Sequence, residues 1–181
     1  IFLACELNPR LFENALRSNN SKTTRSDWDK ATGRFLAEEC EQVGAIVLST
    51  HPINIDAETR MDTICALIRK EGLRLLNWDE ATIQWRQRVL LARAHQGDSW
   101  PDVSEETLLA TLEDWLRPFL LSVSKLDDLK LLNIASALGQ LLSWDQQNTL
   151  NELLPTHFRV PSGSKVKIDY SQSPPVLSVK L

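Results

Sequence analysis

The spacing of the apolar residues changes along the chain, and this change most constrains the fold. Between Asp56 and Leu154 they recur every three or four positions, which is the spacing of one face of an α-helix. Upstream of Asp56 the sequence is strand-like, and after Pro155 the spacing falls to every second position, as in a strand. The sequence therefore predicts a predominantly helical α+β fold, with a helical centre between two β-rich ends.

Five helices are expected within residues 56–154, and each has a start or stop signal of its own. The first is expected to begin with a cap at Asp56 and end at Gly72, and the second to run from about Asp79 to Gly97. The third is expected to begin at Ser104 and stop at Pro118, and the fourth to run from about Leu126 to Leu142. The fifth is expected to begin with the capping-box pair Ser143 and Gln146 and to end at Pro155. Short loops join these helices, so we expect a compact helical bundle.

The first 55 residues are predicted to be β-rich. Residues 1–7 are typical of a buried strand, residues 11–17 of a short helix, and residues 27–50 of an antiparallel meander. Turns are expected at residues 30–33 and 41–44. Residues 44–50 are expected to form the best-buried strand. The sequence begins at Ile1, without a starting Met and without the features of a signal peptide, so we expect the N-terminus to be a cut end.

Residues 155–181 are predicted to start a C-terminal β-element. The segments HFRV, KVKIDY and VLSVKL alternate like strands, and the turn sequences PSGS and SQSPP separate them. The chain stops inside the last of these strands, so we expect this sheet to be partial. The predicted domains are therefore residues 1–55, 56–154 and 155–181.

Charge and composition exclude several classes of protein. The net charge is −4 and the pI is about 5.4, which does not favour nucleic-acid binding by the chain as a whole. No apolar run is long enough to span a membrane. The three cysteines are odd in number and widely spaced, which favours a reducing cytoplasm over a secreted disulfide framework.

Catalytic and metal-binding patterns are missing from the sequence. No nucleophile has a base nearby, and neither the cysteines nor the histidines have metal-ligand spacing. The DEAT sequence that starts at Asp79 differs by one letter from a helicase box, yet no G-x-x-x-x-G-K-[ST] loop precedes it. We therefore interpret Asp79 as a helix cap and expect no ATP site, catalytic residue, metal or cofactor in this chain.

The candidate contact residues lie mainly near the C-terminus. Residues 155–181 contain four basic residues and one acidic residue. Alternation places Lys165 and Lys167 on one sheet face, where Arg159 of the preceding strand joins them, while Tyr170 falls outside the alternation. The face is equally well interpreted as an edge that binds a nucleic-acid backbone or as a solubilising outer face.

Two other groups have weaker functional interpretations. Arg86 and Arg93 are seven residues apart on one helix and could follow a nucleic-acid backbone, although a solvated face is the favoured interpretation. Trp115 and Trp144 are expected to pack on apolar helical faces. The other four tryptophans stand nearer boundaries, where any one of them could stack on a base.

Several stretches resemble bacterial HrpB-type ATP-dependent helicases, which are DExH-box proteins related to RNA helicases. They are IFLACELNPRLFE, GAIVLSTHPI, LLATLEDWLRPFL, PTHFRVPSGSKVKIDYS and PPVLSVKL, in the order of that family. The resemblance implies two RecA-like motor lobes, a winged helix and a helical bundle upstream. It also implies that residues 1–17 are the tail of an OB-like domain. The ATP and Mg²⁺ sites would lie in those motor lobes, so no family catalytic residue transfers to this chain.

The resemblance leaves two hypotheses about the role of this region. The first is a non-catalytic accessory region of a cytoplasmic RNA helicase that positions or extends the nucleic-acid path, with RNA as the expected nucleic acid. The second is a module that docks on the motor domains of the same chain or on another protein, without contact with nucleic acid. Neither involves a membrane, and neither gives this region turnover of its own.

Overall fold

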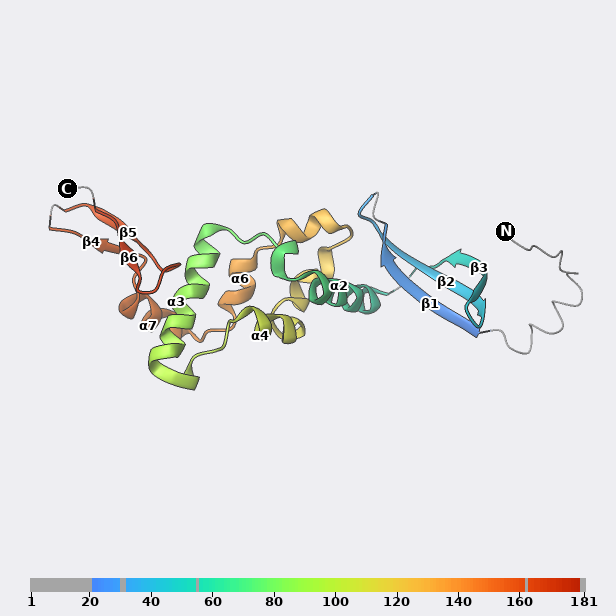
Figure 1. Cartoon of the computed structure of the whole chain (residues 1–181), viewed down its shortest axis with the longest axis horizontal. Coiled ribbons are helices and arrows are strands. Elements are labelled where there is room, and N and C mark those ends of the chain that lie inside the picture. The colour runs from blue at the N-terminus through green and yellow to red at the C-terminus, as the bar shows by residue number, and fades with distance from the viewer. Residues whose placement is uncertain (1–20, 30–31, 55, 162, 180–181) are drawn as a thin grey trace, which may run out of the picture. The chain divides into compact units, whose positions relative to one another are not determined.

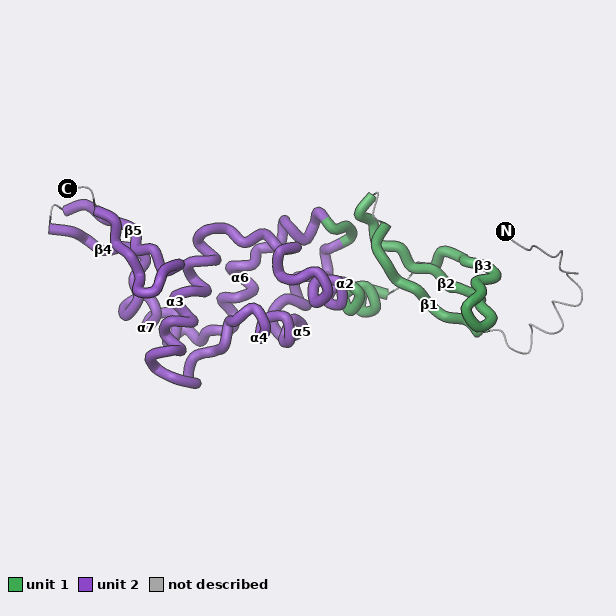
Figure 2. Tube along the Cα trace, in the orientation of Figure 1, with its two compact units in different colours: residues 1–63, 124–126 green, residues 64–123, 127–181 purple. Residues whose placement is uncertain are grey.

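A computed structural model describes residues 21–29, 32–54, 56–161 and 163–179. The chain forms two compact units, one from residues 1–63 and 124–126 and the other from residues 64–123 and 127–181 (Figure 2). The elements are mixed, with an antiparallel sheet in the first unit and helices plus a small sheet in the second (Figure 1). The predicted α+β class is confirmed. The domain boundaries at 55 and 154 stay a prediction, and the strand and short helix expected within residues 1–17 lie outside the described residues.

The sheet of the first unit is an antiparallel meander, as predicted. It consists of β1 (Ser21–Trp28), β2 (Phe35–Val43) and β3 (Ile46–Pro52), in that order. Gly44 has a φ of 58° in the tight turn between β2 and β3, where a residue with a side chain would be strained. The first strand begins at Ser21, well before the predicted Asp27, because its exposed polar residues give no apolar alternation.

The prediction that residues 44–50 form the best-buried strand is wrong. Ile46, Val47 and Leu48 are 60%, 41% and 40% exposed. The buried residues of this sheet are instead Trp28 and Cys40, together with Ala37. β3 pairs only with β2 and is an edge strand of the described sheet. An apolar run in its sequence therefore does not imply that another element covers the strand.

Three of the five predicted helices are confirmed, together with their start signals. α2 (Ala57–Glu71) starts where the Asp56 carboxylate accepts from the Thr59 amide at 2.7 Å. α3 (Glu80–Gln96) is capped by Asp79 in the same way, and Gly97 follows it with a φ of 81°. α7 (Trp144–Leu153) begins with the complete Ser143–Gln146 capping box.

The third predicted helix is broken in the structure. It is divided into α4 (Glu105–Ala110) and α5 (Leu112–Trp115) at Thr111, whose hydroxyl donates to the Thr107 carbonyl at 2.8 Å. Side-chain bonds of this kind compete with the backbone ladder. The α-helix ends at Trp115, before Pro118 as predicted, and Pro118 lies at the start of a 3-10 helix over Arg117–Ser122.

The fourth predicted helix is also broken. It is a 3-10 helix over Leu126–Leu131, followed by α6 (Ile134–Gly139). The Asn133 side chain accepts from the Ser136 amide at 2.9 Å, which starts a new helix inside the expected one. Two further 3-10 helices, Leu73–Leu75 and Gly97–Ser99, follow α2 and α3.

The core of the second unit surrounds Trp115. Its ring is completely buried, as predicted, and its indole nitrogen donates to the Leu108 carbonyl at 2.9 Å. Trp144, by contrast, is 76% exposed, so its predicted core position is wrong. No helix in the described part of the chain is long and apolar enough to cross a membrane.

The C-terminal residues form a second antiparallel sheet, as predicted. Its strands are β4 (His157–Arg159), β5 (Lys165–Asp169) and β6 (Val176–Leu177), and β5 lies between the other two. Figure 1 shows this sheet beyond α7 and α3 within the second unit. Tyr170 directly follows β5 and is buried, so it lies at the strand end rather than on the lysine face.

Candidate nucleic-acid interface

Basic side chains share one face of the hairpin formed by β4 and β5. Arg159 pairs with Lys165, and His157 pairs with Lys167. Directly opposed residues of an antiparallel pair project on the same side, and so do residues two apart on one strand. His157, Arg159, Lys165 and Lys167 therefore form one exposed surface, which we call the basic face. The structure brings the three predicted cations together, and their nucleic-acid role stays a prediction.

Gln84 of α3 attaches this sheet to the helical part of the unit. Its amide nitrogen donates to the Asp169 carboxylate at 2.9 Å, and its amide oxygen accepts from the Tyr170 backbone at 2.8 Å. The Tyr170 hydroxyl donates to the Pro155 carbonyl at 2.7 Å, and burial raises its pKa. The buried glutamine thus fixes the end of β5 against α3.

Asp169 collects several donors at this attachment. Its carboxylate accepts from the Ser171 amide and hydroxyl at 2.9 and 2.7 Å, as well as from Gln84. The Ser171 and Gln84 hydrogen bonds lower the pKa of Asp169 to about 2. The carboxylate is therefore ionised at neutral pH, and its own hydrogen bonds hold it against Gln84 and Ser171.

Arg88 joins α3 to the end of α7. Its guanidinium donates to the carbonyls of Leu154 and Leu150 at 2.6 and 3.1 Å, and to the Asn151 side chain at 2.8 Å. A cation at a helix C-terminus meets the negative end of the helix dipole, and the Leu154 carbonyl lies beyond the last hydrogen bond of the helix, from the Leu154 amide to the Leu150 carbonyl. Burial lowers the pKa of Arg88, whose residue is only 4% exposed. This residue therefore has a structural role.

The cations of the basic face differ in their partners. Lys167 donates to the Glu80 carboxylate on α3 at 2.6 Å, which ties the middle of β5 to the helix. Arg159 and Lys165 form neither a hydrogen bond nor an ion pair with another described residue. They are consequently the cations of this face whose charge is available to an incoming anion.

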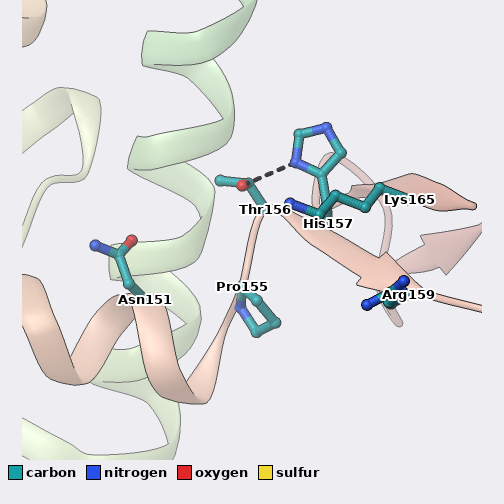
Figure 3. A pocket seen from close by; sticks show the side chains of 6 residues that line it. All are labelled: Asn151, Pro155, Thr156, His157, Arg159 and Lys165. Carbon is teal, nitrogen blue, oxygen red and sulfur yellow. Dashed lines mark hydrogen bonds between the residues drawn. The ribbon is translucent and has the colours of Figure 1, made fainter.

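A polar cavity of about 310 Å³ lies beside Arg159 and Lys165 (Figure 3). Its lining consists of Asn151, Pro155, Thr156, His157, Arg159 and Lys165. The Thr156 hydroxyl and His157 Nδ1 are hydrogen-bonded at 3.0 Å, and the Lys165 side chain extends alongside them. The lining contains donors and cations and no carboxylate, so it suits an anionic group such as a phosphate.

Arg86 and Arg93 lie on a different face of α3 from the attachment to the sheet. Arg86 donates to the Val103 carbonyl at 2.8 Å and lies 5.6 Å from the centre of the Trp78 ring. Arg93 donates to the Trp100 carbonyl at 2.5 Å and to Asp98 at 2.7 Å. These bonds hold the segment after α3 against the helix. The structure does not bring the two arginines to the basic face, and their predicted role in nucleic-acid binding stays a prediction.

The sequence reasoning missed Gln84 and Arg88, which position the basic face. Arg88 belongs to the arginine-rich run 86–93, but its spacing alone does not distinguish it from its neighbours. Asp79 of the DEAT sequence accepts from the Thr82 amide, and this hydrogen bond lowers its pKa. Among the residues that the structure describes, no three His, Cys, Asp or Glu side chains come together as a metal site would need.

Two family models match separate parts of the chain. Residues 21–53 match the connector region of the ATP-dependent RNA helicase HrpB, and residues 115–181 match the ATP-dependent helicase C-terminal family, HrpB_C. The first match covers the sheet of β1, β2 and β3. The second covers the region from Trp115 to the C-terminal sheet, including the whole basic face.

Curated and solved relatives agree with these matches. The ATP-dependent RNA helicase HrpB of Escherichia coli (strain K12) is 37% identical over 158 residues, which are 86% of this chain and 20% of that protein. The crystal structure of the E. coli DExH-box NTPase HrpB superposes with a TM-score of 0.68 at 32% identity, over 97% of this chain and 22% of the other. A second crystal structure, of the Escherichia coli DEAH/RHA helicase HrpB, gives a TM-score of 0.68 at 36% identity, over 89% of this chain and 21% of the other. The chain thus spans about a fifth of the relatives it matches.

Proposed function

Because this chain carries the connector and C-terminal regions of an HrpB-type ATP-dependent helicase, we propose that it extends the RNA path of the motor. The basic face would hold the phosphate backbone of a single strand as it leaves or approaches the motor lobes. In this role the region binds and orients RNA and performs no turnover. ATP and Mg²⁺ belong, in this proposal, to motor domains of the same polypeptide, and the cytoplasm is its proposed location.

The observation that carries the proposal is the pairing of Arg159 with Lys165 beside a cavity without carboxylates. The chain as a whole has a net charge of −4, so a general attraction for RNA is not expected. Arg159 and Lys165 are a local exception to this acidic balance, because their side chains have no partner among the described residues and line a cavity rich in donors. Phosphate oxygens are the ligands that such a surface binds best.

A docking module without RNA contact is the second candidate. It is favoured by the exposed apolar residues of β3, Ile46, Val47 and Leu48, which belong to an edge strand of the described sheet. Edge strands of this kind can pair with another segment or protein. This candidate requires no role for Arg159 or Lys165.

Salt-dependent binding to single-stranded RNA separates the two candidates. A double substitution Arg159→Ala/Lys165→Ala should weaken binding and lower the slope of log K against log salt by ~1.4, because each phosphate contact on a single strand contributes about 0.7. Lys70→Ala/Lys130→Ala removes two exposed lysines from α2 and from the 3-10 helix Leu126–Leu131 and is the matched control. RNA binding that is equal in both double variants would contradict the proposal.

A further inference from the structure

A second cavity of about 300 Å³ lies next to the polar one and has a different lining. The two cavities share Thr156 and His157, so they are neighbours around the start of β4. The second continues between α3 and β5, where Trp85, Ile168 and Tyr170 contribute apolar and aromatic surface. A polar cavity lined by cations is therefore adjacent to an aromatic one, where the C-terminal sheet meets α3.

The polar groups of the second cavity are largely engaged by the protein itself. Both ends of the Gln84 amide bond to the end of β5, and Arg88 is bound to the end of α7. Lys167 is paired with Glu80. What the cavity offers a ligand is thus mainly the half-buried Trp85 side chain and its apolar neighbours, with the His157 and Thr156 side chains at the rim.

We propose that this second cavity receives one unstacked base of the single strand whose phosphate lies in the polar cavity. The inference rests on the proposed function, and it adds that the face binds the bases as well as the backbone. A volume near 300 Å³ is at the lower end of ligand cavities, which suits one base rather than a larger group. Stacking on Trp85 provides affinity without requiring a particular base, because every base has a flat aromatic face.

Charge favours a nucleotide over a peptide as the occupant. A peptide without an acidic residue beside the side chain in the second cavity would leave the neighbouring polar cavity, with Arg159 and Lys165, without an anion. A nucleotide has a flat aromatic base and a phosphate joined at close range, which matches the two linings in their observed order. The arrangement tolerates any sequence, since the amide of Gln84, which could read a base edge, is already bound by the protein.

The test compares the binding of an oligouridylate with that of an abasic oligonucleotide that has the same number of phosphates. Both are roughly ten nucleotides long, which is within the range of small single-strand binding sites. Trp85→Leu keeps an apolar side chain and removes the aromatic ring, so it should weaken binding of the oligouridylate about tenfold and leave the abasic strand unchanged. Trp85→Phe should restore most of the loss. Trp144→Leu removes a tryptophan that is 76% exposed and lines neither cavity, and it is the matched control.

The outcomes distinguish this inference from the function on which it rests. A 4-thiouridine placed in the oligonucleotide should crosslink to a peptide containing Trp85 or His157. If Trp85→Leu binds both strands like the wild type, or the crosslink falls outside these peptides, the base cavity is wrong while salt-dependent binding through Arg159 and Lys165 stands. If Arg159→Ala/Lys165→Ala binds as tightly as the wild type, or no RNA binds, the proposed function fails and the base cavity with it.

Discussion

Replacing Arg88 with alanine removes a buried guanidinium from the junction of α3 and α7. The side chain donates to the carbonyls of Leu150 and Leu154 and to the amide oxygen of Asn151. Alanine supplies no donor, so the Leu154 carbonyl and the Asn151 side chain lose their bond to Arg88, while the Leu150 carbonyl keeps only the Leu154 amide. Because these bonds fix the chain where α7 leads into β4, the substitution should destabilise the second unit and loosen the C-terminal sheet.

The size of this destabilisation follows from the number of hydrogen bonds that Arg88 forms and from the burial of its charge. Hydrogen bonds that involve a charged group each contribute about 1.5–3 kcal/mol, so three bonds set an upper limit near 5–9 kcal/mol. Burial lowers the pKa of Arg88, which means that its charged form pays a desolvation cost that the substitution removes. Water can also reach Leu154, which is only half-buried. We therefore expect a loss of about 3 kcal/mol in the free energy of unfolding.

Urea unfolding followed by tryptophan fluorescence measures this loss, and hydrogen exchange of β4 and β5 locates it. Arg74→Ala is the control, because its side chain is 75% exposed and, among the described residues, pairs only with Glu71 on the surface. That control should cost about 0.5 kcal/mol or less. A loss for Arg88→Ala below about 1 kcal/mol, or unchanged exchange in the sheet, would refute the reasoning, since truncating one partner of a buried polar network costs more than that.

Three further predictions concern other parts of the chain. Asp79→Ala should lower stability by about 1 kcal/mol through loss of the cap on Thr82, while Asp79→Asn keeps most of it, as thermal unfolding will show. The depressed pKa of Asp169, about 2 against an ordinary 3.8, means that its hydrogen bonds to Ser171 and Gln84 stabilise the sheet fully above pH 3.8. This contribution should disappear as the pH falls through about 2, and an NMR titration that shows the sheet unchanged across that window would contradict it. Finally, a phosphate-release assay should detect no ATP hydrolysis by the isolated chain with or without RNA, and RNA-stimulated hydrolysis would overturn the non-catalytic role.

The helix starts were predictable because their signals are local. A cap such as Asp56 or Asp79 bonds to an amide three residues later, and the Ser143–Gln146 box lies within one turn. The breaks inside the third and fourth helices were not predictable from apolar spacing. Thr111 and Asn133 can bond to a helix or interrupt it, and packing decides which happens.

Burial was harder to predict than secondary structure. Trp144 and the residues of β3 are apolar in patterns that usually indicate a core, yet both are exposed. A pattern shows which side chains share a face, but it does not show whether another element covers that face.

The basic face was predictable in its composition and not in its support. Alternation along β5 and the short turn before it are enough to bring Arg159, Lys165 and Lys167 together. The attachment to α3 depends on Gln84 and Asp169, which are 85 positions apart, and on Arg88 with α7. No local pattern indicates such contacts, and the same holds for the cavity beside Trp85.

RNA-stimulated ATP hydrolysis by the helicase proposed to contain this chain tests the central claim most directly. If the basic face extends the RNA path, Arg159→Ala/Lys165→Ala should raise the KM for RNA several-fold and leave kcat at saturating RNA unchanged, because it removes only binding of the strand. The effect should shrink as salt increases, since it depends on phosphate contacts. An unchanged KM for RNA, or a fall in kcat with no change in KM, would contradict the account and favour docking on the motor.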